Sequence, residues 1–111
     1  LKSLPSEIGQ LSNLIDIGFD ENKLDSIPPE IGLLTKLRDL SLNDNQLQFI
    51  PSEIGLLTNL INLYLHKNKL QSLPSEIGSL ERLGVFYADI NLKPQYSVFL
   101  ANNKYCTIKN K

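Results

Sequence analysis

The sequence contains a single cysteine, Cys106, and a single histidine, His66, and it has no tryptophan and no methionine. One cysteine cannot form an internal disulfide, whereas small secreted domains commonly depend on several. We therefore expect the protein to work in a reducing compartment, the cytoplasm. One histidine and one cysteine also leave few ligands for a transition metal and few groups for nucleophilic catalysis. The composition predicts no enzyme activity, no metal site and no cofactor.

Long apolar runs and an excess of positive charge are also lacking. The apolar stretches span only a few residues, far short of the roughly 20 that cross a bilayer, and no basic and then apolar leader opens the chain. Eleven basic residues, of which two are arginines, stand against twelve acidic ones. A nucleic-acid-binding domain normally carries a basic face. We expect neither a membrane span nor a signal peptide, and no nucleic-acid partner.

Leucine, isoleucine and asparagine are present in excess and fill 44 of the 111 positions. A motif of the form Leu/Ile-Pro-x-Glu-Ile-Gly recurs four times at a constant offset of 23 residues, beginning at Leu4, Ile27, Ile50 and Leu73. Each copy is followed by L-x-x-L-x-L-x-x-N-x-L or a close variant. The asparagines of this second motif are Asn22, Asn45, Asn68 and Asn91. Four copies in register predict a repeat architecture in which one supersecondary unit stacks on the next.

Each repeat is expected to contain one short β-strand. Residues 39–43 alternate polar and apolar side chains, which predicts a half-buried strand with Leu40 and Leu42 facing inward. Strands of successive turns would lie about 4.8 Å apart in a parallel sheet. We interpret the asparagine that follows each strand as structural, because a short amide inside a tight turn can satisfy backbone groups that the bend leaves without partners.

The opposite side of each turn is expected to be a short helix. Pro5, Pro28, Pro51 and Pro74 would start these helices, since proline fixes φ where no N–H donor is needed, and a glutamate follows each of them two residues later. Glycines after the glutamates limit bulk where the chain bends, and no phosphate-binding spacing accompanies them, so we expect no small-molecule substrate. The side chains predicted to face inward are Ile8, Leu11, Ile31, Leu34, Ile54, Leu57, Ile77 and Leu80.

The two ends of the chain depart from the template. Leu1 aligns with Leu24, so the chain enters in the middle of a turn, and we expect either a missing N-terminal portion or an uncapped start. Residues 1–93 form four repeats. The net charge changes from −5 over residues 1–91 to +4 over the last twenty residues. We therefore expect residues 94–111 to form a cap with a helix near 95–102 and a strand near 104–108, although a basic binding tail stays open as an alternative.

Four positions of each repeat vary from turn to turn. They are the two outward positions of the strand and two positions shortly after it. The first two turns place acidic side chains there, whereas the last two place aromatic and apolar ones. Tyr64 and Tyr87, in adjacent turns, would form one adhesive patch, because tyrosine offers a large stiff surface with a polar tip. The predicted partner-binding residues are Asp16, Asp20, Glu21, Asp39, Ser41, Asn43, Asp44, Asn62, Tyr64, His66, Lys67, Val85, Tyr87 and Asp89. Gly18 and Ile90 occupy the equivalent outward positions in the first and the fourth turn.

Interpretations in which these positions have no binding role also stay open. The tyrosines can be isolated surface aromatics, and the acidic stretch can be a solvated face, which competes evenly with steering of a basic partner. Calcium binding is disfavoured, because the acidic residues lack the spacing of a calcium loop. His66 and Cys106 are assigned to different parts of the fold, which disfavours a catalytic pair.

The repeated L-P-x-E-I-G-x-L-x-x-L-x-x-L-x-L-x-x-N-x-L resembles the 23-residue leucine-rich repeats of bacterial and plant intracellular proteins and of animal signalling scaffolds. The near-identity of the turns also resembles the leucine-rich effectors that intracellular bacterial pathogens inject into host cells. This resemblance, over residues 1–93, implies an α/β solenoid: an arc with a short parallel sheet on its concave face and short helical turns on its convex face. It also implies that the concave face holds another protein.

Two functional hypotheses follow from the sequence. In the first, the chain is a protein-binding module in a heteromeric complex, a regulator or inhibitor that occludes the functional site of its partner, and it acts in the cytoplasm, or in the host-cell cytosol if it is an injected effector. In the second, it is the recognition arm of a larger enzyme or scaffold. No catalytic motif occurs in these residues.

Overall fold

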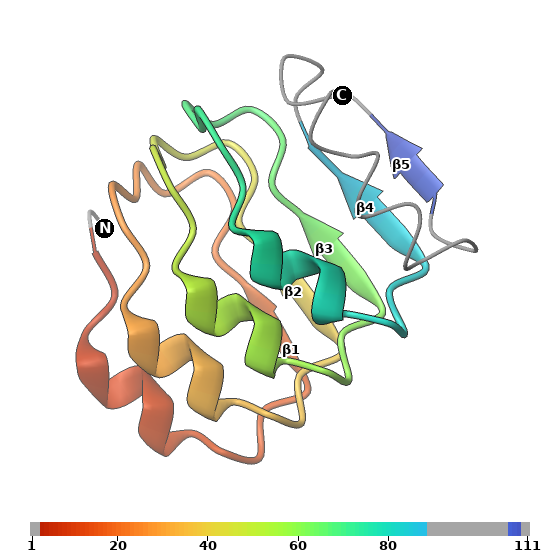
Figure 1. Ribbon diagram of the computed structural model, residues 1–111. Coiled ribbons are helices and arrows are strands. Elements are labelled where there is room, and N and C mark those ends of the chain that lie inside the picture. Colours follow the sequence, from red (N-terminus) through yellow and green to blue (C-terminus); the bar gives the residue numbers. More distant parts are fainter. Residues whose placement is uncertain (1–2, 89–106, 110–111) are drawn as a thin grey trace.

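The computed structural model describes residues 3–88 and the strand at residues 107–109. The chain winds through four turns, each with a short 3₁₀ helix on one side and a three-residue β-strand on the other (Figure 1). The helices are η1 (Ser6–Gln10), η2 (Pro29–Leu33), η3 (Ser52–Leu56) and η4 (Ser75–Ser79). The strands are β1 (Asp16–Gly18), β2 (Asp39–Ser41), β3 (Asn62–Tyr64), β4 (Val85–Tyr87) and β5 (Thr107–Lys109).

The strands form one parallel sheet in the order of the chain, β1-β2-β3-β4-β5. The register from β1 to β4 follows the predicted offset of 23, as in the pairing of Asp16 with Asp39. The strand that the sequence predicts near 104–108 is found as β5, where Val85 pairs with Thr107. The expected helix near 95–102, the predicted contact residue Asp89, and Ile90, Asn91 and Cys106 lie outside the described residues. The division into repeats and a cap at residue 94 stays a prediction.

A single core fills the space between the helices and the sheet. The central side chain of each strand from β1 to β4 is buried, and so is the isoleucine of each helix. Seven of the eight side chains predicted to face inward are buried. The exception is Leu11, which is 51% exposed, so the prediction for this residue was wrong. Leu34, at the same position one turn later, is covered from both sides, whereas Leu11 has a neighbouring turn on one side only in the described part of the chain.

The helices are of the 3₁₀ type and begin one residue later than the sequence predicted. Each preceding proline is extended, with a ψ of 153° at Pro5, and therefore lies just outside the helix. Its carbonyl still accepts the first helical hydrogen bond, from the N–H of Ile8 at 3.0 Å. A five-residue segment gains little from α-helical closure, so the tighter i to i+3 pattern is favoured. No helix of the described residues is long and apolar enough to cross a membrane.

Adjacent helices approach so closely that glycine is required between them. A Cβ atom on Gly55 would lie 2.7 Å from the carbonyl oxygen of Glu76 in the next helix, and one on Gly32 would lie 2.9 Å from that of Glu53. Real Cβ atoms are not found so near to backbone oxygens. The glycine of the repeated motif therefore sets the spacing of the turns.

Asparagine side chains join each turn to the previous one. Oδ1 of Asn45 accepts hydrogen bonds from the backbone N–H groups of Asn22 and Leu24, and Oδ1 of Asn68 accepts one from that of Leu47. Their Nδ2 atoms donate to backbone carbonyls of their own and the preceding turn. The structural interpretation of these two asparagines is confirmed. Their hydrogen bonds fix the position of each turn, and therefore of its strand, relative to the preceding turn.

Candidate protein-binding face

The outward side chains of β1 to β4, together with the second and third residues after each of β1, β2 and β3, form what we call the strand face. The parallel register aligns these side chains in rows across the sheet, because partners in adjacent strands point to the same side. One row consists of Asp16, Asp39, Asn62 and Val85, and the next consists of Gly18, Ser41, Tyr64 and Tyr87. The rows are those that the sequence predicted, and they lie on the concave side of the arc.

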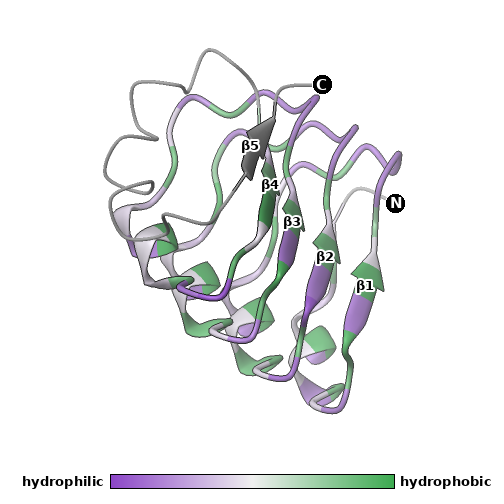
Figure 2. Cartoon of the chain, turned by 90° about the vertical axis from the view of Figure 1, so that its right-hand side faces the viewer, coloured by the Kyte–Doolittle hydropathy of each residue, from purple (hydrophilic) through white to green (hydrophobic). Residues whose placement is uncertain are grey.

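Hydropathy changes along the strand face from the first turn to the fourth. Figure 2 shows both hydrophilic and hydrophobic colour on β1, β2 and β3, whereas β4 carries hydrophobic colour and no hydrophilic colour. Asp16 and Gly18 are exposed, whereas Val85 and Tyr87 are half-buried. The acidic and aromatic halves therefore lie side by side on one sheet.

Three rings form a cluster over the third and fourth turns. The ring centroids of Tyr64 and Tyr87 are 5.1 Å apart with the planes at 77°, and those of His66 and Tyr87 are 5.3 Å apart. The two tyrosines meet edge to face, which is favourable for an aromatic pair at this distance, and the imidazole is tilted at 51° to the ring of Tyr87. His66 is only 7% exposed, so a partner would meet the tyrosines first and the imidazole would support them. We call these three residues the aromatic cluster.

Carboxylates of the first two turns interact across the strands. Asp39 accepts a hydrogen bond from Nδ2 of Asn62 in the next strand. A hydrogen bond with Asp39 raises the pKa of the Asp16 carboxyl above its ordinary value, and desolvation and the negative charge of Asp39 act in the same direction, while Arg38 opposes them. Two acidic side chains so close together favour the approach of a positive group.

A charged row with unusual backbone geometry runs beside the strands. Glu21, Asp44 and Lys67 occupy the same position in successive turns, and each has a φ near +60°. The ammonium of Lys67 lies 4.0 Å from the carboxylate of Asp44, and Nδ2 of Asn43 donates to the same carboxylate at 2.6 Å. The row adds two negative charges and one positive charge to the strand face, and the left-handed conformation is costly for Glu21 and Lys67.

No protein-family model and no curated protein matches the chain. Among solved structures, it is similar to a leucine-rich repeat protein of Leptospira interrogans, with 34% identity and a TM-score of 0.89 over 97% of this chain and 28% of that one. It is also similar to the plant peptide hormone receptor RGFR1 in complex with RGF2, with 32% identity and a TM-score of 0.79 over 99% of this chain and 23% of the receptor.

The chain is a leucine-rich repeat protein. The leucine-rich repeat ectodomain of the receptor kinase SOBIR1 from Arabidopsis thaliana is a further similar structure, with 28% identity and a TM-score of 0.63 over 81% of this chain and 51% of that one. The chain spans less than a third of the length of the first two structures.

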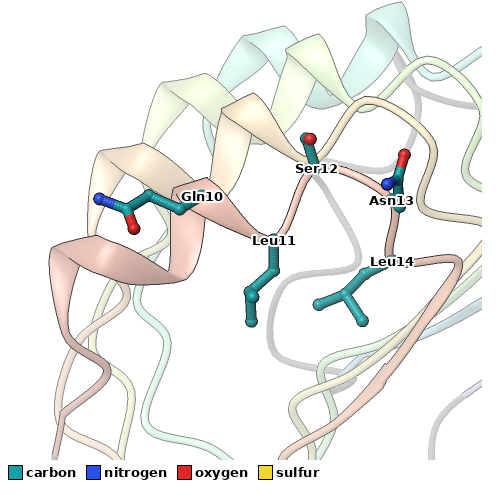
Figure 3. Close-up of a pocket in the computed structure, with 5 residues that line it drawn as sticks. All are labelled: Gln10, Leu11, Ser12, Asn13 and Leu14. Carbon is teal, nitrogen blue, oxygen red and sulfur yellow. The ribbon is translucent and has the colours of Figure 1, made fainter.

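The described part of this leucine-rich repeat protein holds no group of three or more histidine, cysteine or acidic side chains that could bind a metal. A pocket lies at the outer end of the first turn, and Figure 3 shows Leu11 and Leu14 pointing to the same side of its loop. Its lining is Gln10, Leu11, Ser12, Asn13 and Leu14. These five consecutive residues are all uncharged, so the pocket offers no convergent chemistry.

Gly18 occupies its expected row but was not among the predicted partner-binding residues. The open sheet surface above it was not predicted. The signal was the size gradient along its row, from glycine and Ser41 to Tyr64 and Tyr87. Exposed apolar side chains outside the strand face were also missed, notably Leu33 and Leu56 on the helices.

Proposed function

We propose that the strand face of this leucine-rich repeat protein binds another protein. The observation that carries the proposal is the aromatic cluster, in which Tyr64 and Tyr87 are half-buried and lie 5.1 Å apart next to a sheet surface rich in carboxylates. Buried tyrosines flanked by polar groups are typical of the energetic centre of a protein interface. The similar receptor RGFR1, which was solved in complex with RGF2, supports partner binding by this type of fold.

The size of the face supports a single partner. Four variable positions in each of four turns give sixteen residues, which is close to the lower end of the roughly 20 to 30 residues per side of a standard interface. The mode of action that we propose is steric: the chain is a regulator or inhibitor that covers a functional site of its partner and has no catalytic activity of its own. Tyr64 and Tyr87 would fill a depression in the partner while the acidic turns meet basic residues around it.

The setting that we propose is the cytoplasm, or the host-cell cytosol for an injected bacterial effector. The solitary cysteine supports a reducing compartment. The 34% identity with a repeat protein of Leptospira interrogans supports a bacterial relationship.

A second candidate function is the recognition arm of a larger enzyme or scaffold. The chain spans only 28% and 23% of two similar structures, which favours this alternative. The length of the open reading frame separates the two candidates. A product several times longer than 111 residues with a catalytic domain supports the arm, and a product of only a few repeats supports the independent regulator.

To test the proposed function, the parent and two double variants are used to capture binding proteins from the producing or host cell. Tyr64→Ala with Tyr87→Ala removes the half-buried rings of the strand face, and Leu33→Ala with Leu56→Ala removes exposed apolar groups of the helices. We expect the tyrosine variant to bind its captured partner at least about ten-fold more weakly, a loss of about 1.4 kcal/mol. The leucine variant should bind as the parent does. A tyrosine variant that is folded and keeps full affinity overturns the proposal.

A further inference from the structure

The sheet surface over Gly18 is open. A Cβ atom placed on this residue would have one contact within 4 Å, the Oδ1 atom of Asp20 at 3.6 Å. Gly18 pairs with Ser41, which in turn pairs with Tyr64. The row therefore passes from bare backbone through a small hydroxyl to a phenol ring over two strand spacings of about 4.8 Å each.

Negative charge lies on both sides of this row. Asp16 and Asp39 are two residues before Gly18 and Ser41 on their strands, and Asp20 is two residues after Gly18. Arg38 offsets part of this negative charge, since it lowers the pKa of the Asp16 carboxyl, but it is one cation against the three carboxylates Asp16, Asp20 and Asp39. A positive group from outside would thus meet an excess of carboxylate here.

We infer that the partner protein inserts one long cationic side chain, an arginine or a lysine, over Gly18 and Ser41, with its aliphatic stem against Tyr64 and its charge among Asp16, Asp39 and Asp20. This inference rests on the proposed function and specifies the chemistry of the partner. The open position gives the side chain room, the carboxylates neutralise its charge, and the ring covers its stem.

Other residue types fit this position poorly. An apolar side chain would remove water from three carboxylates without replacing their hydrogen bonds, which is unfavourable. An acidic side chain would be repelled. Lysine and arginine can bury their methylene groups on apolar surface while keeping the charged end among polar groups, and both interact favourably with a tyrosine ring. Arginine can in addition donate two parallel hydrogen bonds to one carboxylate.

The variant Gly18→Val blocks this position without disturbing the fold. Gly18 is not in the positive-φ region, the space above it is open, and valine is favourable in a strand. Gly84→Val is a matched control, because a Cβ on Gly84 would have its nearest contact at 3.8 Å, with the carbonyl oxygen of Ile61 outside the strand face. We expect both variants to melt at or above the temperature of the parent.

The probe is an acetylated and amidated heptapeptide of serine, alanine and threonine with arginine at its centre. Its control peptide carries citrulline, which has nearly the same shape and no charge. Binding is followed by the amide chemical shifts of the folded chain, titrated to about 10 mM peptide, since a single anchored side chain corresponds to millimolar affinity.

The expected result is a saturable shift of the amides in β1 and β2 with the arginine peptide. The citrulline peptide should bind at least about five-fold more weakly, as loss of one charge pair of about 1 kcal/mol implies. Gly18→Val should weaken arginine binding at least about ten-fold, and Gly84→Val should leave it unchanged. Equal binding of the two peptides, shifts confined to other parts of the chain, or no shift at about 10 mM would each overturn the inference.

The inference and the proposed function fail in different ways. If a captured partner depends on Tyr64 and Tyr87 but binds Gly18→Val as tightly as the parent, the cationic contact is wrong and the binding face stands. If the tyrosine variant keeps its partner, the binding face is wrong whatever the peptides do.

Discussion

The Oδ1 atom of Asn45 accepts a hydrogen bond from the backbone N–H of Leu24, in the preceding turn, at 2.9 Å. Its Nδ2 atom donates to the carbonyls of Phe19, Leu42 and Asn43 at 2.9 to 3.2 Å. The side chain is only 7% exposed, so water cannot easily replace these bonds. One amide group therefore satisfies backbone atoms of two turns and holds them at a fixed distance.

The variant Asn45→Ala is expected to lower the free energy of unfolding by about 3 kcal/mol, because it leaves several buried backbone groups without partners. Asn22→Ala is the matched control. Asn22 is more exposed, and its Nδ2 atom donates to the carbonyl of Asp20 at 3.2 Å, so we expect a loss below about 1 kcal/mol. Urea denaturation of both variants measures the difference. Equal losses would show that the burial of Asn45 has no energetic consequence.

The glycine of the helix motif gives a second prediction. Gly55→Ala is expected to destabilise the fold by about 2 kcal/mol, since the new methyl group would lie 2.7 Å from the carbonyl oxygen of Glu76 and two helices would have to separate. Gly84→Ala introduces the same methyl group where the nearest atom is 3.8 Å away, and it should be neutral or stabilising by up to about 1 kcal/mol. Thermal unfolding of the two variants tests this prediction. Similar melting temperatures would contradict the close approach of the two helices.

The left-handed residue Lys67 gives a third prediction. Its φ is +59°, a conformation that asparagine adopts more readily than lysine does. Lys67→Asn should therefore stabilise the protein by about 0.5 to 1 kcal/mol, although it removes an ion pair between two partly exposed side chains. Lys69→Asn, an exposed lysine outside the positive-φ set, should not stabilise. Denaturant midpoints test the pair. A gain in the control alone would contradict the role of the backbone conformation.

The prediction of the fold from the sequence succeeded where one residue type repeats at a fixed phase. The offset of 23 fixes the register of β1 to β4, and the isoleucine of each helix motif is buried as expected. It was wrong for Leu11, since the phase of a residue does not say whether a neighbouring turn covers it. It also placed the helix starts on the prolines, because the sequence cannot distinguish a residue that caps a helix from the first residue in it.

The candidate site was predictable in outline and not in detail. The sequence identified the rows of the strand face, because outward positions alternate with buried ones. It did not indicate that His66 is covered, since its exposure depends on the rings of Tyr64 and Tyr87. Nor did it indicate the opening over Gly18, which depends on how far the Asp20 side chain reaches. Such features depend on contacts between turns, and a single repeat does not contain them.

The carboxyl pair of Asp16 and Asp39 gives a prediction about pH. The hydrogen bond with Asp39 is the main cause of the raised pKa of Asp16, and desolvation and the charge of Asp39 add to it. A raised pKa means that the folded state binds the proton more tightly than the unfolded state, whose carboxyl titrates near 3.8. The stability that Asp16 contributes is therefore fully present below this pH and is lost as the pH rises through the folded-state pKa.

Asp16→Asn should remove this loss, because the amide can still donate to the Asp39 carboxylate and never acquires a negative charge. We expect the variant to unfold at the same temperature as the parent near pH 3 and at a higher temperature near pH 7, with the gain appearing between the two. The same substitution in an Asp39→Asn background should show a smaller dependence on pH, since the partner charge is gone. A gain that is constant with pH, or one that is unaffected by Asp39→Asn, would show that the two carboxyl groups do not interact. Thermal melts of the four proteins in the double-mutant cycle at both pH values measure the coupling directly.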